Sequence, residues 1–168
     1  FMAVPTMYAK LIEDHDRRIS EGRLGGQSLE FIKSACTSRI RLMVSGSAAL
    51  PEPVMSRWQS ITGHTLLERY GMTETGMILT NPLRGTRIPG AVGQPYPQVE
   101  VCIARPNVYT PCGYDILARG THRKTTVTPG CEGEQGELYV RGPNLFAGYW
   151  NKPQATAEAF TKDGWFKT

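Results

Sequence analysis

The sequence predicts an α/β fold in which a parallel βαβ layer is followed by a smaller, mostly antiparallel β subdomain. In the first half, strand, helix and strand patterns follow one another with short connections, as in a βαβ unit. After Pro82 the chain changes to short β-rich runs separated by proline and glycine. With 168 residues, 40% of them hydrophobic, the chain is long enough to bury one core. We expect a parallel α/β part over residues 1–82 and a β-rich subdomain over residues 83–168.

Two helices are predicted before the first long strand. Thr6 can cap a helix that begins after Pro5, and the glycine-rich stretch 21–26 ends it. A second helix is predicted over Ser28–Cys36. The residues expected to face the core are Met7, Leu11 and Ile12 in the first helix, and Leu29, Phe31, Ile32 and Ala35 in the second.

The βαβ unit is predicted from three consecutive segments. Ile40–Val44 is a short apolar run that suits a buried strand. A helix over Pro51–Ile61 follows, and Gly63 can end it in the left-handed conformation. His64–Arg69 is the next predicted strand. Ligands of parallel sheets bind beyond the carboxyl ends of the strands, so the segments after these two strands should converge on one crevice.

The β-rich part contains several shorter elements. Its strands are separated by proline and glycine, and a last short helix precedes the closing aromatic residues. The predicted elements are strands at Val99–Ile103 and Gly136–Arg141, a hairpin of Tyr114–Leu117 with Thr125–Thr128, a helix at Pro153–Phe160 and a strand around Trp165–Lys167.

Composition excludes several classes of function. The formal charge of +4 comes from basic residues scattered among acids, which suits weak attraction to nucleotides and does not indicate nucleic-acid binding. The four cysteines have neither C-x-x-C spacing nor paired histidines, which argues against a zinc site and a disulfide scaffold and favours a reducing compartment. No apolar run approaches the length of a transmembrane helix.

The segment Glu68–Thr75 concentrates the side chains best suited to chemistry. Activation of a carboxylate by ATP needs the polyphosphate charge neutralised, the reacting oxygens aligned and adenine held in place. Thr73 offers a hydroxyl for the α-phosphate or the attacking carboxylate, and Glu74 offers an oxygen ligand for Mg²⁺. Tyr70 offers a flat face for adenine, and Gly71 lets the backbone approach closely. Each residue alone would suit a plain turn, but the ordered set at a strand end favours function.

The segment Ser45–Pro51 has two interpretations. It can be a simple strand-to-helix connection with Ser47 as a cap, or a stretch of small residues that leaves room for a ligand. It lacks the G-x-S-x-G spacing of a serine hydrolase and the Walker spacing of a P-loop kinase, which makes both of those functions poor candidates.

Four motifs in order resemble those of the adenylate-forming, AMP-binding acyl-CoA synthetases. They are Glu68–Thr75, the G-x-V-G-x-P turn within Gly90–Pro97, the G-E-L-x-V-R-G pattern that opens Gly136–Trp150, and Asp163–Thr168. The resemblance covers nearly the whole chain. It implies an acid–thiol ligase that activates a carboxylic acid with ATP, releases pyrophosphate and transfers the acyl group to coenzyme A. The fold implied is part of the large N-terminal domain of these enzymes.

The resemblance also implies a set of site residues. Thr73 and Glu74 would be catalytic, and Glu74 would hold Mg²⁺. The acid would contact Ser45, Arg69, Val92 and Gly93. The nucleotide would be bound by residues from two segments: Ser45, Gly46, Ser47 and Ala48 from the first, and Glu68, Arg69, Tyr70, Gly71, Met72 and Thr73 from the second.

Both ends of the chain look internal to a longer protein. The sequence begins Phe1-Met2-Ala3 and ends within what reads as a strand. By resemblance, a phosphate loop would precede Phe1, and the ribose-binding aspartate, the hinge and a small domain with a lysine would follow Thr168. We expect the chain alone to be inactive and to need the rest of the longer protein for activity.

Arg69 bears on the identity of the acid. A fixed guanidinium can bind a second carboxylate in a bidentate manner, although Arg69 could instead point outward or pair with a nearby glutamate. Wider resemblance favours the malonyl-CoA synthetase branch, which implies malonate or methylmalonate as the acid and a mitochondrial location. The alternatives are a medium- or long-chain fatty acyl-CoA synthetase and a truncated, non-catalytic nucleotide-binding isoform. The segments that carry this resemblance are Arg41–Pro51, Thr62–Glu74 and Thr126–Gly130.

Overall fold

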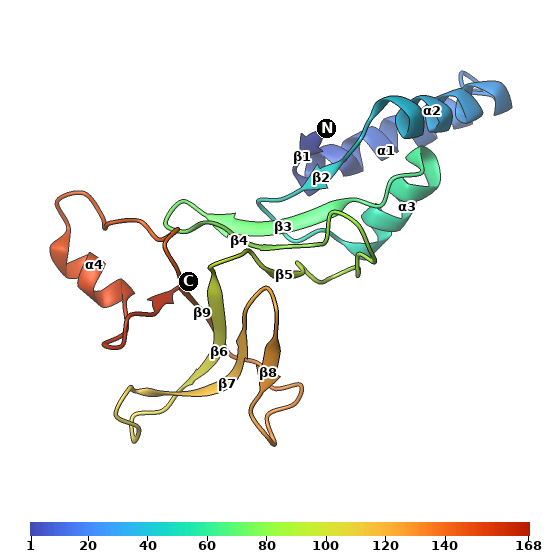
Figure 1. Ribbon diagram of the computed structural model, residues 1–168. Coiled ribbons are helices and arrows are strands. Elements are labelled where there is room, and N and C mark those ends of the chain that lie inside the picture. The colour runs from blue at the N-terminus through green and yellow to red at the C-terminus, as the bar shows by residue number, and fades with distance from the viewer. The chain divides into compact units, whose positions relative to one another are not determined.

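A computed structural model describes residues 1–168 as four helices and two five-stranded sheets (Figure 1). The elements in chain order are β1 (Met2–Ala3), α1 (Pro5–Ser20), α2 (Gly26–Arg39), β2 (Val44–Ser45), α3 (Glu52–Thr62), β3 (Leu67–Met72), β4 (Gly76–Thr80), β5 (Gln94–Pro95), β6 (Glu100–Pro106), β7 (Tyr114–Gly120), β8 (Thr125–Val127), β9 (Glu137–Arg141), α4 (Pro153–Ala159) and β10 (Phe166–Lys167). The strand orders are β1-β2-β3-β4-β5 and β10-β9-β6-β7-β8. Together they give the predicted mixed α/β architecture.

The chain divides into two compact units. The first comprises Phe1–Tyr70 and Thr80–Gly93, and the second comprises Gly71–Leu79 and Gln94–Thr168. The tip of the β3–β4 hairpin therefore belongs to the second unit, although the strands that lead to it start and end in the first. The domain boundary expected after residue 82 stays a prediction.

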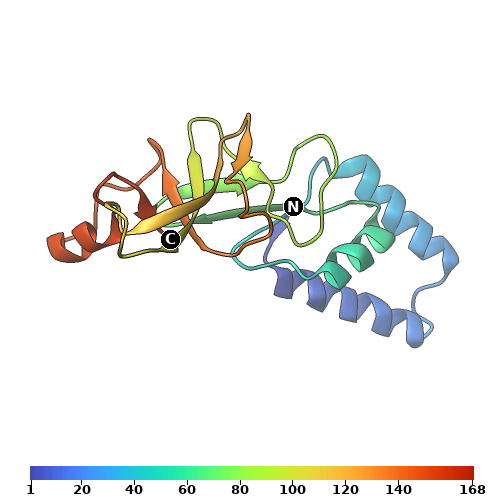
Figure 2. The same cartoon turned by 90° about the horizontal axis from the view of Figure 1, so that it is seen from below.

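The first unit contains the predicted βαβ arrangement. β2 pairs in parallel with β3, with Val44 opposite Leu67 and Ser45 opposite Glu68, and β1 adds to the other side of β2 in parallel. The intervening helix α3 contacts both α1 and α2, and the three helices lie together in Figure 2. Gly63 ends α3 with φ = 76°, as predicted. The strands are shifted from expectation: the run before Val44 is not a strand, and β3 begins at Leu67.

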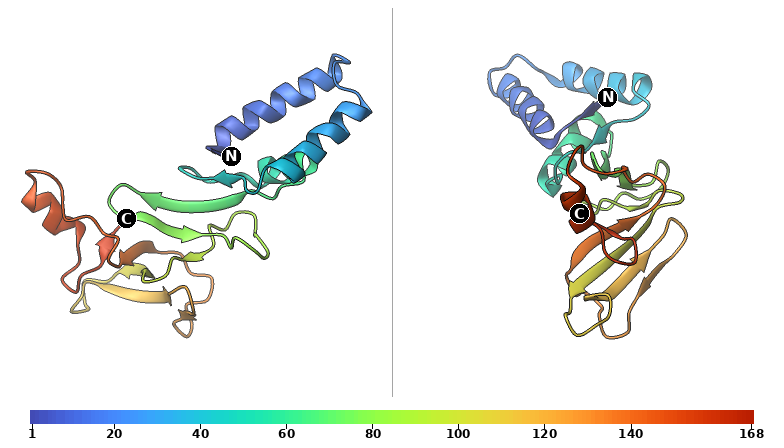
Figure 3. Two further views of the ribbon diagram at one scale, coloured as in Figure 1. Left: turned by 45° about the horizontal axis from the view of Figure 1, so that its top comes forward. Right: turned by 90° about the vertical axis from the view of Figure 1, so that its left-hand side faces the viewer.

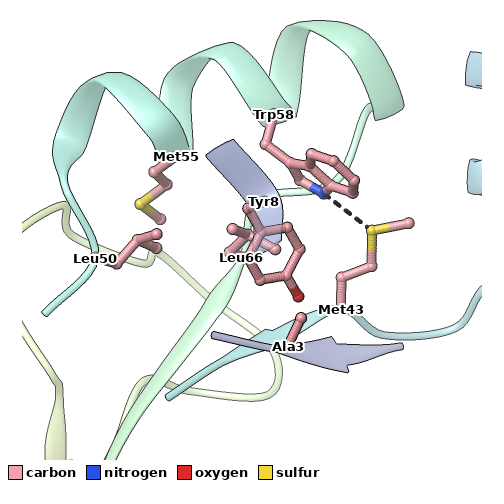
Figure 4. Close-up of a cluster of buried hydrophobic side chains, with 7 residues drawn as sticks. All are labelled: Ala3, Tyr8, Met43, Leu50, Met55, Trp58 and Leu66. Atoms are coloured by element: carbon pink, nitrogen blue, oxygen red, sulfur yellow. Dashed lines mark hydrogen bonds between the residues drawn. The ribbon is translucent and has the colours of Figure 1, made fainter. Parts of the chain in front are cut away.

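The core of this unit joins α1, β2, α3 and β3. Tyr8 is fully buried, its ring meets that of Trp58 edge-on with centroids 4.8 Å apart, and its hydroxyl donates to the carbonyl of Val44 at 2.7 Å. The indole N–H of Trp58 points at the sulfur of Met43, 3.1 Å away (Figure 4). Burial raises the pKa of Tyr8 to about 12. The clustered residues are Ala3, Tyr8, Met43, Leu50, Met55, Trp58 and Leu66.

The predicted inward faces of the first two helices are partly wrong. Ile12 packs against the core as expected, but Met7 and Leu11 are 52% and 45% exposed, and Tyr8, which was not expected there, is buried. The helical period was right, but the buried face lies one residue further round α1 than expected. Phe31 is 67% exposed, and α2 has no fully buried residue. Thr6 is not a cap, because α1 begins at Pro5 and Val4 is its N-cap residue.

The second unit is built on an antiparallel sheet, whose yellow and orange strands are in the lower part of both views of Figure 3. The predicted hairpin is confirmed: β7 pairs with β8, with Ala118 opposite Val127. Trp165 lies 1% exposed at the end of the chain, and the guanidinium carbon of Arg141 is 4.4 Å from its ring centroid. This sheet buries Cys102, Ala104, Tyr114, Tyr139 and Trp165.

Truncation of Leu66 tests the first core. Leu66 is fully buried at the centre of the cluster, so Leu66→Ala should lower the free energy of unfolding by about 2–5 kcal/mol. Phe31→Ala removes more atoms but from an exposed site, so the free energy of unfolding should change by less than about 0.5 kcal/mol. Urea unfolding of both variants measures the difference. Equal losses would contradict the assignment of Phe31 to the surface.

Candidate active site

The carboxyl end of β2 lies beside the first half of β3, where parts of the two predicted site segments are neighbours. Ser45 lies opposite Glu68 in the parallel ladder. One residue further on, Gly46 lies against Arg69: a Cβ added at Gly46 would be 3.5 Å from both Cγ and the carbonyl oxygen of Arg69. Ser45 and Gly46 therefore lie beside Glu68 and Arg69, which are inside β3. The convergence expected of the segments that follow the two strands stays a prediction.

The buried side chain of Glu68 has a structural role in this site. Glu68 is 3% exposed, and Oε1 of its carboxylate accepts a hydrogen bond from the backbone N–H of Leu50 at 3.0 Å. The carbonyl of Glu68 accepts the backbone N–H of Asn81 at 2.9 Å. The Asn81 side-chain amide also donates to the carbonyl of Ala91 at 2.8 Å. Glu68 and Asn81 thus tie the loop before α3 and the loop before Gly93 to β3.

Two buried polar atoms at the strand ends have no hydrogen-bond partner. They are Oγ of Ser45 and Oε2 of Glu68. Ser45 is fully buried, so an unpaired hydroxyl there would be costly unless a ligand or a water molecule binds it. Sequence reasoning identified both residues but gave no reason to expect that Glu68 would be buried or that Asn81 would support it.

The small-residue loop presents backbone to its surroundings. Ser47 and Ala48 are exposed, and Ser47 has φ = 68° in the left-handed region, which a serine rarely adopts. Such strain is often found at ligand sites. Serine at this position does not cap α3, whose N-cap residue is Pro51 without a side-chain hydrogen bond.

Arg69 is half-buried and is not paired with its neighbour Glu68. The Glu68 carboxylate is turned to Leu50 instead, and a guanidinium nitrogen of Arg69 contacts the sulfur of Met2. The alternative in which Glu68 neutralises Arg69 is therefore wrong. A cation held beside the loop of small residues is able to receive an anionic group.

The motif of Tyr70–Thr75 lies on a hairpin and not in a loop after a finished strand. β3 continues through Met72, and Thr75 N–H donates to the Met72 carbonyl at 3.2 Å to close the turn. Thr75 is fully buried, whereas Thr73 is exposed and Glu74 is half-buried at the tip. The two residues predicted to be catalytic are thus the accessible ones of the turn.

A second segment fixes this turn. The side-chain amide of Asn144 donates to the Thr75 carbonyl at 2.6 Å, and the Phe146 N–H donates to the Glu74 carbonyl at 2.7 Å. The hydroxyl of Tyr149 donates to Oε1 of Glu74 at 3.0 Å. We call Asn144, Phe146 and Tyr149 the hairpin clamp. Sequence reasoning named none of these three residues as a site residue, and its only signal was the G-E-L-x-V-R-G pattern that opens their segment.

The loop that ends at Gly93 is docked closely on β4. Gly93 has φ = 93°, and an added Cβ would lie 2.0 Å from the Thr80 carbonyl oxygen, so no other residue fits. Val92 is half-buried beside it. The roles of Val92 and Gly93 towards an acid stay predictions.

A cavity of about 510 Å³ in the first unit lies outside this site. Arg41, His64 and Arg87 are among its lining residues, and none of the predicted site residues is. Arg87 donates to the carbonyls of Thr65, Pro82 and Leu83, which gives its guanidinium a structural task.

Three further properties of the chain concern metal clusters, thiols and membrane spans. No group of three or more histidine, cysteine, aspartate or glutamate side chains is arranged to hold a metal ion. Cys36, Cys102, Cys112 and Cys131 are all free thiols. None of the helices combines the length and apolar character of a bilayer-crossing segment.

Comparison with known proteins relates this geometry to a family. The family model described as AMP-binding enzyme matches residues 1–150. The human mitochondrial malonate–CoA ligase ACSF3 is 55% identical over 170 aligned residues, which cover 100% of this chain and 29% of that protein.

Solved structures of malonyl-CoA ligases have the same fold. ATP-bound MatB from Rhodopseudomonas palustris is 36% identical with a TM-score of 0.72, over 99% of this chain and 27% of that one. A malonyl-CoA ligase in a ternary product complex with methylmalonyl-CoA and AMP is 38% identical with a TM-score of 0.70, over 99% and 29%. The chain therefore spans between a quarter and a third of the length of these relatives.

Proposed function

Since the chain belongs to the AMP-binding enzyme family, we propose that it is part of an ATP-dependent, AMP-forming acid–thiol ligase that converts malonate or methylmalonate to the CoA thioester. The observation that carries this proposal is the 55% identity, over the whole chain, with a malonate–CoA ligase. We call the longer protein that would contain this chain the parent protein. Its other segments would be needed for activity, and the mitochondrial relative favours a mitochondrial location.

The reaction we propose has two steps. A carboxylate oxygen of the acid attacks the α-phosphorus of ATP, forming an acyl-adenylate and releasing pyrophosphate. The thiol of coenzyme A then attacks the acyl carbon, a thioester forms, and AMP leaves with the electron pair of the broken C–O bond. Thr73, exposed at the hairpin tip, would hydrogen-bond the reacting phosphate or carboxylate oxygens. Tyr70 and the backbone of residues 45–48 would hold the nucleotide.

Glu74 fits a magnesium site completed by substrate. Mg²⁺ in nucleotide enzymes is usually held by one or two carboxylates together with phosphate oxygens and water, so the lack of a three-ligand protein cluster is compatible with it. Glu74 supplies one half-buried carboxylate, with Oε1 held by Tyr149. When bound, the ion would neutralise charge on the phosphates.

Arg69 would select the acid. Its guanidinium lies beside Gly46, the residue that follows β2, and is not neutralised by Glu68. It would receive the distal carboxylate of malonate. The same cation in the apolar tunnel of a fatty acyl-CoA ligase would be desolvated without a partner, which is costly. This favours a dicarboxylic acid over a fatty acid.

Product analysis of the parent protein tests the proposal. Incubation with malonate, ATP and coenzyme A should give malonyl-CoA together with equal amounts of AMP and pyrophosphate. Formation of ADP and phosphate, or of no thioester, would contradict an AMP-forming ligase.

A further inference from the structure

We propose that Tyr149 is a positioning residue that orients Glu74 as a ligand of the nucleotide-bound magnesium ion. Its hydroxyl would hold Oε1 of Glu74 and leave Oε2 to face the metal. This inference rests on the proposed function. It also gives a task to the Gly136–Trp150 motif, whose residues are otherwise explained only by packing.

The first argument is that one short segment grips the turn at three points. Asn144, Phe146 and Tyr149, the hairpin clamp, donate to the Thr75 carbonyl, the Glu74 carbonyl and the Glu74 carboxylate respectively. The first two bonds fix the backbone of the turn, and the third fixes the side chain. A segment that served packing alone would have no need of a donor aimed at the carboxylate.

The second argument is that the clamp itself is rigidly held on its aromatic side. The Phe146 ring lies 4.8 Å from that of Tyr149 and 5.5 Å from that of Phe166, both edge-on, and stacks on Phe160 at 6.2 Å. Phe160 and Phe166 are themselves 5.4 Å apart. Tyr149 therefore keeps its ring orientation through contacts that do not involve its hydroxyl.

The third argument is that the backbone of Tyr149 is also fixed. Its N–H donates to Oγ1 of Thr156 in α4 at 2.9 Å, and that hydroxyl donates to the Lys152 carbonyl at 2.9 Å. Gly148 precedes it with φ = 149°, and an added Cβ there would lie 2.9 Å from Cγ2 of Thr156. The phenol is thus placed by α4 and the aromatic cluster before any ligand binds.

The fourth argument is chemical. A free glutamate side chain samples several rotamers, and binding a metal through it costs the entropy of ordering it. A neutral phenol donor restricts the carboxylate without cancelling its charge, whereas a lysine or arginine partner would compete with the metal for that charge. Outer hydrogen bonds of this kind commonly change metal affinity by 10- to 100-fold.

The test uses the parent protein and two tyrosine-to-phenylalanine variants. Tyr149→Phe removes the hydroxyl and keeps the ring that packs on Phe146. Tyr109→Phe is the matched control, because Tyr109 is 95% exposed and outside the site. ATP affinity is measured by calorimetry without acid or coenzyme A, in EDTA and over a series of Mg²⁺ concentrations.

For Tyr149→Phe we expect the Mg²⁺ concentration that gives half of the affinity gain to rise roughly tenfold. Its ATP affinity in EDTA should stay that of the wild type, and Tyr109→Phe should match the wild type throughout. An unchanged Mg²⁺ dependence would overturn the inference. An equal loss of affinity in EDTA would also overturn it, because that pattern indicates a general structural effect.

Malonate-dependent ATP–pyrophosphate exchange by the wild type separates this inference from the proposed function. If exchange occurs and the Mg²⁺ dependence of Tyr149→Phe is normal, only the role of Tyr149 fails. If the wild type shows no carboxylate-dependent exchange, the proposed function fails and the inference fails with it.

Discussion

Replacing Arg69 with alanine in the parent protein is expected to remove most malonate activation while leaving ATP binding intact. Loss of one partner of a buried, hydrogen-bonded charge pair costs about 2–5 kcal/mol, so kcat/KM for malonate should fall by roughly 30-fold to 4,000-fold. The geometry behind this expectation is the half-buried guanidinium beside Gly46, with Glu68 turned away to Leu50. Steady-state kinetics measure the loss of malonate activation. Calorimetric titration with ATP measures whether ATP binding is retained.

An exposed arginine provides the control for charge alone. Arg84→Ala removes the same positive charge from an exposed position outside the predicted site, and both malonate kinetics and ATP affinity should match the wild type. If Arg69→Ala instead abolishes ATP binding, Arg69 belongs to the nucleotide site or to the fold, and the dicarboxylate assignment is wrong.

Substituting Gly71 with alanine should cause a loss of similar size by a different route. An added Cβ would lie 2.1 Å from the Gly76 carbonyl oxygen and 3.0 Å from Cα of Met77, and neither backbone atom can rotate away. The hairpin would have to open, which would displace Thr73 and Glu74. A misplacement of about 1 Å can cost 10²-fold in rate, so we expect at least roughly that loss in kcat for Gly71→Ala.

Gly25→Ala is the matched control for this substitution. Gly25 has φ = −106°, and an added Cβ would meet no atom within 4 Å, so activity should be unchanged. Gly71→Ala should also lower the unfolding midpoint in a thermal melt. Full activity of Gly71→Ala would contradict the close approach of the two strands.

The βαβ arrangement was predictable because its signals are local. An apolar run, a proline near a helix start and a glycine at its end all act within a few residues, and Gly63 ends α3 as expected. The buried face of α1 was not predictable in the same way. Ile12 is four residues from Tyr8 and five from Met7, so it suits either face, and only the tertiary contact of Tyr8 with Trp58 decides which face is buried.

The candidate site shows a similar division. The pairing of its two strands could be predicted because a βαβ unit places them in one parallel sheet, and Ser45 does lie opposite Glu68. The role of each side chain could not be predicted, because its hydrogen-bond partner is distant in sequence. Glu68 binds Leu50 18 residues away, and Glu74 binds Tyr149 75 residues away. From the sequence, a carboxylate in a polar motif suggests a ligand contact. The structure shows that the Glu68 carboxylate instead accepts a backbone hydrogen bond from Leu50.

The most direct test of the central claim is ATP–pyrophosphate exchange by the parent protein with malonate, methylmalonate, acetate and octanoate compared side by side. Our account predicts exchange led by malonate or methylmalonate, well above acetate and octanoate, because Arg69 would bind a second carboxylate. Exchange led by octanoate would contradict it: adenylation would remain, but the acid and the role of Arg69 would both be wrong.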